Sequence, residues 1–294
     1  MKRRGAKIWL VVYFELYLMF LGASVVLLGV LALTPRKRFP RRVVAWWIAI
    51  FGLGTGVWVV VLFGSSTFDE RLGVASVRAP SPGQPVLVFM YGWNGDRSTW
   101  GEFPRLIADD PRFDGMGIAL VTYRSRDGIE GRPVSSTGAD VARLISTKLG
   151  SQPIIVAAHS MGGLLVRHII ANGEVWPDLK VVRVVSVGSP FDGAEPARLS
   201  RHLGVTPLTL ADLTRGSPFL ASLNKQWNER QRHGWHGEDA CIGGRSDNVV
   251  VLASALHGCT KKLPPLDNGH VDIVKPTSRD HAAYKAISSA LLGQ

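Results

Sequence analysis

The chain has 294 residues, of which 46% are hydrophobic and only 19% are charged. A soluble domain usually carries about 25% charged residues, and the mean hydropathy here is +0.13, so part of the chain is expected to avoid water. This composition excludes a disordered chain, and two cysteines cannot form a disulfide scaffold at this length. The formal net charge is +11, and +6 of it lies in residues 1–70, beside apolar segments. That distribution is typical of a membrane protein and argues against nucleic-acid binding.

Two long apolar runs lie near the N-terminus. Residues 8–33 contain one charge, Glu15, and residues 43–63 contain none. Both runs reach the roughly 20 residues that a helix needs to cross a bilayer, and the basic loop 34–42 joins them. The sequence therefore predicts an N-terminal membrane region, residues 1–63, that forms a transmembrane helical hairpin and makes the protein a multi-pass membrane protein.

Two questions about this region stay open. A cleaved signal peptide is an alternative for the first run, although its apolar part would span only about 7–15 residues. The basic residues that flank the hairpin are nearly balanced between the N-terminus and the loop, so the positive-inside rule does not fix which side carries the downstream domain.

The pattern changes after a polar linker at residues 64–84, and the domain at 85–294 alternates short apolar runs with helical ones. Four brief runs rich in β-branched residues are predicted as strands: 85–90, 117–123, 153–158 and 181–187. Helices are expected at 100–109, 137–149, 161–171 and 278–292. This alternation predicts an α/β domain with a mostly parallel sheet and helices on both faces. In such a sheet, a functional site lies beyond the carboxyl ends of the strands.

The segment PIIVAAHSMGGLLVRHII contains the strongest functional signal. It predicts a strand, a tight turn at Ser160 and a helix that begins at Met161. A serine on such a strained turn presents its hydroxyl above the sheet, next to a helix N-terminus. The backbone N–H of Met161 then faces the position where a tetrahedral oxyanion would form. The alternative is an ordinary N-capping serine, but a cap requires neither the preceding His159 nor the two following glycines.

The A-H-S-M-G sequence around Ser160 resembles the G-x-S-x-G motif of the α/β-hydrolase superfamily, in its lipase and serine esterase branch. Within that branch the chain is most similar to relatives of the GPI inositol-deacylase and to serine-active-site-containing proteins. The resemblance extends from Pro85 to the C-terminus, with Ala158 in place of the first glycine. It implies an α/β-hydrolase fold and hydrolysis of carboxylic esters through a serine, an acid and a histidine.

The segment VLVFMYGWNGDRSTW is similar to the family's second motif, in which a histidine usually precedes the glycine. Here the pair is Tyr91 and Gly92, and the resemblance implies that the N–H of Trp93 is the second oxyanion donor. A backbone donor tolerates this change of side chain, provided that Gly92 lets the chain turn. Trp100, at the start of a predicted helix, is expected to pack in the core.

The resemblance also implies a base and an acid, since the family's chain order is serine, acid, histidine. His270, in LDNGHVDIVKP just before the final helix, matches the position and the local signature of the base. Asp247 lies in the turn after a short apolar run and is the expected acid, which would orient the imidazole. Asp192 is the alternative acid. Asp239 and Asp272 are expected to be solvated surface charges.

These residues predict a membrane-anchored serine hydrolase that cleaves carboxylic esters, with ester or lipid substrates and the bilayer as partners. An acyltransferase that uses the same residues, and a non-catalytic membrane-tethered interaction module, are the alternatives. The sequence carries no metal or nucleotide motif, so no cofactor is expected. Cys241 and Cys259 are compatible with a disulfide or with two buried thiols. The physiological substrate and the oligomeric state are not predicted.

Overall fold

A computed structural model describes residues 72–125, 131–203 and 206–294. The predicted hairpin, at 8–33 and 43–63, lies outside the described residues. Chain contacts separate Met1–Phe68 from Asp69–Gln294, and every element described below belongs to the second unit. Across the described ranges, no helix combines the length and the apolar character needed to cross a bilayer.

A seven-stranded sheet organises the domain, in the order β1-β3-β2-β4-β5-β6-β7. All neighbouring strands run parallel except β1 and β3, which are antiparallel. The prediction of a mostly parallel sheet is thus confirmed. The strands are β1 Gly73–Arg78, β2 Val86–Met90, β3 Gly117–Thr122, β4 Pro153–His159, β5 Lys180–Val187, β6 Glu238–Ile242 and β7 Lys261–Lys262.

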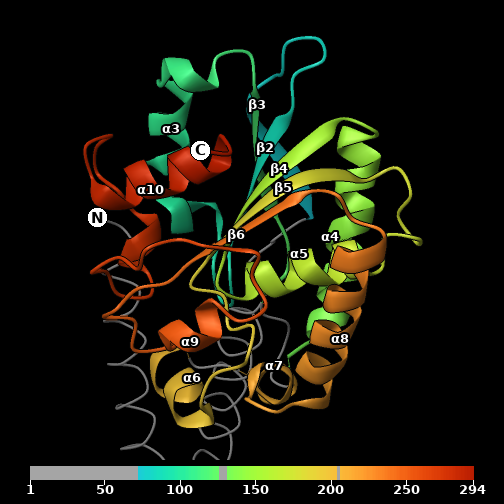
Figure 1. Cartoon of the computed structure of the whole chain (residues 1–294), viewed down its shortest axis with the longest axis vertical. Coiled ribbons are helices and arrows are strands. Elements are labelled where there is room, and N and C mark those ends of the chain that lie inside the picture. Colours follow the sequence, from blue (N-terminus) through green and yellow to red (C-terminus); the bar gives the residue numbers. More distant parts are fainter. Residues whose placement is uncertain (1–71, 126–130, 204–205) are drawn as a thin grey trace, which may run out of the picture. The chain divides into compact units, whose positions relative to one another are not determined.

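The central strands are buried on both faces, because their side chains alternate between two hydrophobic clusters. In β2, Val88 and Met90 belong to one cluster, and Leu87 and Phe89 to the other. Helices cover both clusters, as Figure 1 shows: α4, α5 and α8 lie on one face, and α3 and α10 on the other. This two-sided burial explains why the strands read as continuous apolar runs.

The helices on these faces begin and end at recognisable signals. Helix α8 starts after the capping Ser217, whose side chain accepts from the amide of Leu220, and it ends at Gly234. Helix α10 is capped by the ring of His281. Their bounds are α3 Phe103–Ala108, α4 Val134–Leu149, α5 Met161–Ala171, α8 Pro218–His233 and α10 Ala282–Leu291. Three 3₁₀ turns accompany them: η1 Arg97–Trp100, η2 Pro111–Phe113 and η3 Asp272–Val274.

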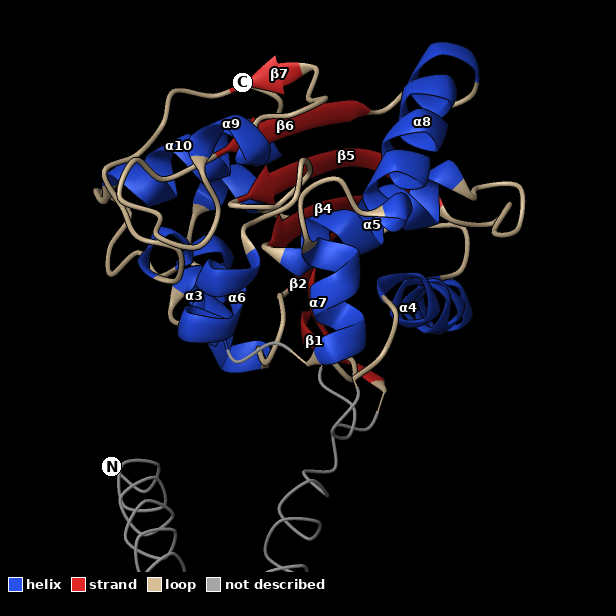
Figure 2. Cartoon of the chain, turned by 90° about the horizontal axis from the view of Figure 1, so that it is seen from below, coloured by secondary structure: helices blue, strands red, loops and turns tan. Residues whose placement is uncertain are grey.

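Three short helices lie beyond the carboxyl ends of the strands, at the edge where parallel sheets place their sites. They are α6 Pro196–Leu203, α7 Pro207–Leu213 and α9 Leu252–Ala255. Figure 2, seen from below, shows α6 and α7 in front of this edge. Two expectations change here: residues 73–78 of the expected linker form the edge strand β1, and the helix expected at 100–109 is divided into η1 and α3.

Candidate active site

Ser160 occupies the sharp turn between β4 and α5. Its φ is 55°, a left-handed value that is costly for a non-glycine residue. A backbone hydrogen bond from its amide to the carbonyl of Val187, at 3.0 Å, holds this conformation. Its side chain makes no capping bond to α5, so the alternative of an ordinary N-cap is wrong. The turn instead leaves the hydroxyl available for another partner.

That partner is His270, which lies in the chain immediately before η3. The Nε2 atom of His270 is 3.0 Å from the Ser160 Oγ, and its Nδ1 atom is 2.8 Å from Oδ2 of Asp247. The carboxylate can only accept, so the Nδ1–H donates to it, and Nε2 is left to accept from the serine hydroxyl. The structure thus brings together Ser160, His270 and Asp247, the three side chains expected from the sequence.

Asp247 divides its two oxygens between the imidazole and the backbone. Its Oδ1 accepts from the amides of Val249 and Val250, both at 2.8 Å, while Oδ2 faces His270. Burial alone would raise the pKa of Asp247, but the hydrogen bond from His270, the electrostatic interaction with that residue and the two amides together lower it. The carboxyl group therefore stays ionised at neutral pH and keeps the imidazole in one tautomer.

Gly188, which directly follows β5, allows this pair to form, and sequence reasoning missed it. Its φ is +58°, and a Cβ placed there would lie 3.3 Å from Oδ2 of Asp247 and 3.6 Å from Nδ1 of His270. Any larger residue would press on the hydrogen bond between the acid and the base. The sequence does not indicate that Gly188 faces Asp247 and His270, because a glycine pattern alone does not reveal distant neighbours.

The two residues expected to supply oxyanion donors are Met161, which follows the serine in the chain, and Trp93, which follows a glycine that packs against it. Met161 is the first residue of α5, so its amide has no acceptor one turn earlier in the helix. The chain at Gly92 passes directly against Ser160, since a Cβ at Gly92 would lie only 2.6 Å from the serine Cβ. This contact places the following residue, Trp93, beside the reacting group. The indole of Trp93 donates to the carbonyl of Leu203, at the end of α6, at 3.2 Å.

Tyr91 stands where the family more often has a histidine, and it forms a reciprocal pair with Tyr123. Its hydroxyl donates to the Tyr123 carbonyl at 2.7 Å and accepts from the Tyr123 amide at 2.8 Å, while the Tyr123 hydroxyl donates back to the Tyr91 carbonyl. The two rings stack with their centroids 4.3 Å apart. The pair ties the ends of β2 and β3 together just before the Gly92 turn.

The other candidate acids have different surroundings. Asp192 is 3.4 Å from Arg215 and is 44% exposed, so it forms a surface ion pair. Asp272 is exposed, as expected. For Asp239 the expectation of a solvated surface charge is wrong, because it is buried and its Oδ2 lies 3.7 Å from the Nη2 of Arg167.

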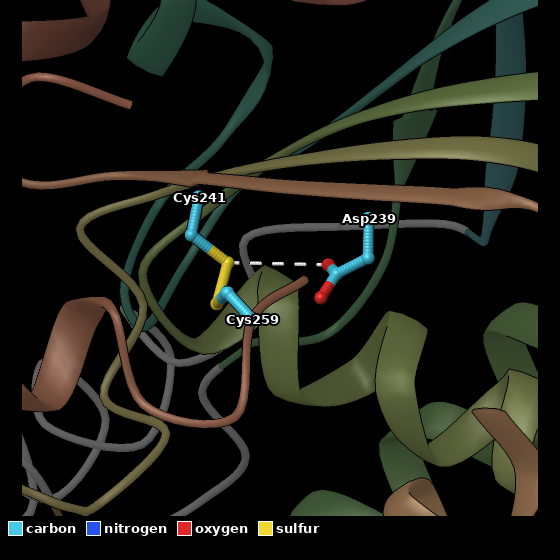
Figure 3. A group of neighbouring side chains, drawn as sticks. All are labelled: Asp239, Cys241 and Cys259. Carbon is cyan, nitrogen blue, oxygen red and sulfur yellow. Dashed lines mark hydrogen bonds between the residues drawn. A yellow bond between two sulfur atoms is a disulfide. The ribbon is translucent and has the colours of Figure 1, made fainter. Parts of the chain in front are cut away.

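Asp239 and Arg167 lie beside a disulfide between Cys241 and Cys259, whose Cα atoms are 6.1 Å apart. Figure 3 shows the disulfide together with Asp239. The Arg167 guanidinium lies 3.0 Å from the Cys259 sulfur and 3.2 Å above the ring centroid of Phe191. Burial lowers the pKa of Arg167 to about 10 and raises that of Asp239, although the attraction between the two charges opposes both shifts. A side-chain oxygen of Asp239 and the sulfurs of Cys241 and Cys259, atoms of the kind that ligate metals, also lie within 4.8 Å of one another. The two sulfurs, however, are bonded to each other.

Comparison with known proteins agrees with this geometry. A family model described as lecithin:cholesterol acyltransferase matches residues 144–206, which include the Ser160 turn. Protein SERAC1 of Mus musculus and of Homo sapiens is 25% identical over 183 residues, which cover 57% of this chain and 28% of the relative. The chain thus spans less than a third of the length of these curated relatives.

Solved structures share the fold. Lipase BlEst2 of Bacillus licheniformis, in its mature form, superposes with a TM-score of 0.50 and 19% identity, covering 70% of this chain and 93% of the lipase. A putative thioesterase from a Silicibacter species superposes with a TM-score of 0.52 and 16% identity, covering 77% of this chain and 88% of the other. Together with the family model and the relatives, these matches show an α/β-hydrolase fold similar to that of lipases and esterases.

Proposed function

We propose that this protein is a membrane-anchored serine hydrolase that cleaves carboxylic esters. The observation that carries the proposal is the hydrogen-bonded chain from Ser160 through His270 to Asp247, with contacts of 3.0 and 2.8 Å. A serine hydroxyl is a weak nucleophile at neutral pH, and a neutral imidazole oriented by a carboxylate is the arrangement that activates it. All three side chains are largely buried, which strengthens these interactions by keeping water away.

The reaction follows from the positions of these atoms. The Ser160 Oγ bonds to the acyl carbon while its proton passes to Nε2 of His270, and the N–H groups of Met161 and Trp93 stabilise the oxyanion. The bond from the acyl carbon to the alcohol oxygen then breaks, and His270 returns the proton to that oxygen. A water molecule attacks the acyl-serine in the same way, releasing the carboxylic acid and restoring the serine hydroxyl.

Lipid esters are the substrate class that we propose. The solved neighbour from Bacillus licheniformis is a lipase, and the matching family is lecithin:cholesterol acyltransferase. The two apolar runs at residues 8–33 and 43–63 would hold the site close to substrates dissolved in a bilayer. This anchoring is part of the proposal.

Acyl transfer is the second candidate function. The match to the lecithin:cholesterol acyltransferase family supports it, because the matched residues 144–206 include the proposed nucleophile. Transfer and hydrolysis share the acyl-enzyme and differ only in whether water or another alcohol attacks it. Incubation of the full chain in vesicles that contain a labelled ester and a long-chain alcohol distinguishes them, since hydrolysis yields the free acid and transfer yields a new ester.

The proposal is tested by labelling the full-length chain with a fluorophosphonate probe. We expect covalent attachment at Ser160, no labelling of Ser160→Ala, and a loss of at least ~1,000-fold in ester hydrolysis for that variant. Ser186→Ala is the matched control, because it removes an equally buried serine hydroxyl that lies outside the proposed machinery. Undiminished esterase activity in Ser160→Ala would reject the assignment. A wild-type chain that folds but is never labelled would favour the non-catalytic interaction module.

A further inference from the structure

His159, the residue before the proposed nucleophile, contacts the backbone of the proposed base. Its Nε2 atom lies 2.8 Å from the carbonyl oxygen of His270, across 111 positions of sequence. We infer that His159 is a positioning residue, whose N–H holds the His270 backbone so that the imidazole of His270 meets Ser160. This inference rests on the proposed function and adds a component that the three-residue arrangement lacks.

The chemistry of the contact fixes the state of the His159 ring. A backbone carbonyl can only accept, so Nε2 carries the proton, and Nδ1 has no hydrogen-bond partner among the described residues. Burial has the largest effect on the pKa of His159 and the electrostatic interaction with His270 the second largest, and together they lower it to about 3. The ring is therefore a neutral, single donor throughout the pH range in which an esterase works.

The surroundings hold the His159 ring in place. It is 4% exposed, its ring centroid lies 6.4 Å from that of the fully buried Trp100, and the two rings meet edge to face. The ring of His270 also lies close, at a centroid distance of 4.9 Å. Because the His159 ring is confined in this way, its N–H keeps one position, and it can hold the backbone of the His270 loop in place.

The loop that carries His270 has no regular secondary structure of its own. His270 lies between β7 and η3, so sheet pairing does not hold its backbone. His159 is the last residue of β4, which pairs with β2 and β5 at the centre of the sheet. One hydrogen bond thus connects the backbone of the base to the strand that directly precedes the nucleophile. A displacement of about 1 Å in such a site can cost around 100-fold in rate.

Four variants of the full-length chain test the inference. His159→Phe keeps a flat ring but removes the donor, and we expect kcat for a chromogenic butyrate ester to fall about 10- to 100-fold with KM nearly unchanged. His159→Gln and His159→Asn are matched amides: the longer side chain reaches the His270 carbonyl and the shorter one does not. We expect Gln to restore most of the rate and Asn to restore little. His168→Phe is the control, because His168 is a partly buried imidazole on α5 that the mechanism does not use.

The second readout is the low-field proton resonance of the His270 Nδ1–H, which reports the hydrogen bond to Asp247. We expect this resonance to shift or broaden in the Phe and Asn variants and to recover in the Gln variant. A general loss of stability would not produce this difference between Asn and Gln. If His159→Phe does not fold, the comparison of Gln with Asn decides. Equal rates and unchanged resonances in Gln and Asn would overturn the inference while Ser160 labelling persists. Absence of labelling in the wild type would instead overturn the proposed function.

Discussion

The hydroxyl of Ser160 and the imidazole of His270 owe their contact to residues that never touch a substrate. Gly188 leaves space beside the Asp247–His270 pair, and His159 forms a hydrogen bond with the backbone carbonyl of His270. Asp247 itself is fixed by the amides of Val249 and Val250. These contacts therefore fix the geometry around the Ser160 hydroxyl, and removing one of them should change the rate at which Ser160 reacts.

Replacing Gly188 with alanine separates crowding from backbone strain. Gly150 also has a positive φ, +57°, but a Cβ there would meet nothing within 4 Å, whereas at Gly188 it would crowd Asp247 and His270. We expect Gly188→Ala and Gly150→Ala each to lose about 1 kcal/mol of stability through the left-handed backbone. Only Gly188→Ala should also slow fluorophosphonate labelling, by roughly 10-fold or more.

Urea unfolding and labelling rates, measured on the same preparations, check this prediction. If both variants slow labelling equally, strain rather than crowding is responsible. If neither does, the acid–base pair tolerates a displacement of a few tenths of an ångström, and Gly188 has no positioning effect.

The candidate site could be predicted to the extent that short motifs describe it. Ser160 was found from its strand–turn–helix pattern, and His270 and Asp247 from the chain order and local signatures of a family. Their convergence is seen in the structure, whereas their catalytic roles stay predictions. The contributions of His159 and Gly188 could not be found, because each depends on a contact between residues distant in sequence.

At the scale of elements, the buried central strands were predictable and the sheet edges were not. Strands β2, β3, β4 and β5 lie within one or two residues of the predicted runs, because burial makes β2, β3 and β4 largely apolar and the second half of β5 is buried as well. Strand β1 is half exposed and mixed in composition, so it resembled a linker. Strand β7 has only two residues, too few for any periodicity to show.

The packing of α10 on the sheet includes a buried carboxylate that no pattern indicated. Asp110 accepts hydrogen bonds from the backbone amide, Nε and Nη2 of Arg112 and from the hydroxyl of Tyr284, the last at 2.7 Å. The hydrogen bonds from Arg112 lower the pKa of Asp110 and, with that of Tyr284, outweigh the opposing effect of burial. This network joins η2 to the last helix of the chain.

The lowered pKa predicts how this network responds to acid. A carboxylate with a depressed folded-state pKa stabilises the protein fully above its unfolded value of about 3.9 and loses that contribution as the pH falls through the folded value. We expect Asp110→Asn to lower the free energy of unfolding by about 1–3 kcal/mol at pH 7, and by progressively less below about pH 4.

Denaturant titrations of both proteins at pH 7 and pH 3 provide the measurement. Since Asn does not titrate, the difference between the two proteins isolates the carboxylate. A difference that stays constant over this range would show that the ionisation of Asp110 contributes nothing to stability.

At the scale of the whole molecule, the predicted hairpin gives the clearest expectation. The runs at residues 8–33 and 43–63 carry one charge in total, so we expect the full-length chain to remain with membranes after alkaline carbonate extraction. Recovery in the supernatant would contradict the hairpin. Protease digestion of sealed vesicles, read with a C-terminal tag, then reports the side of the bilayer, which the balanced basic flanks leave open.

Trp93 carries two connections in one residue: its amide is the proposed second oxyanion donor, and its indole is bonded to Leu203 at the end of α6. A change in the position of α6 would therefore act on the same residue whose amide is proposed to stabilise the oxyanion. Substitutions in α6 would then change turnover more than affinity, because the oxyanion forms only in the transition state.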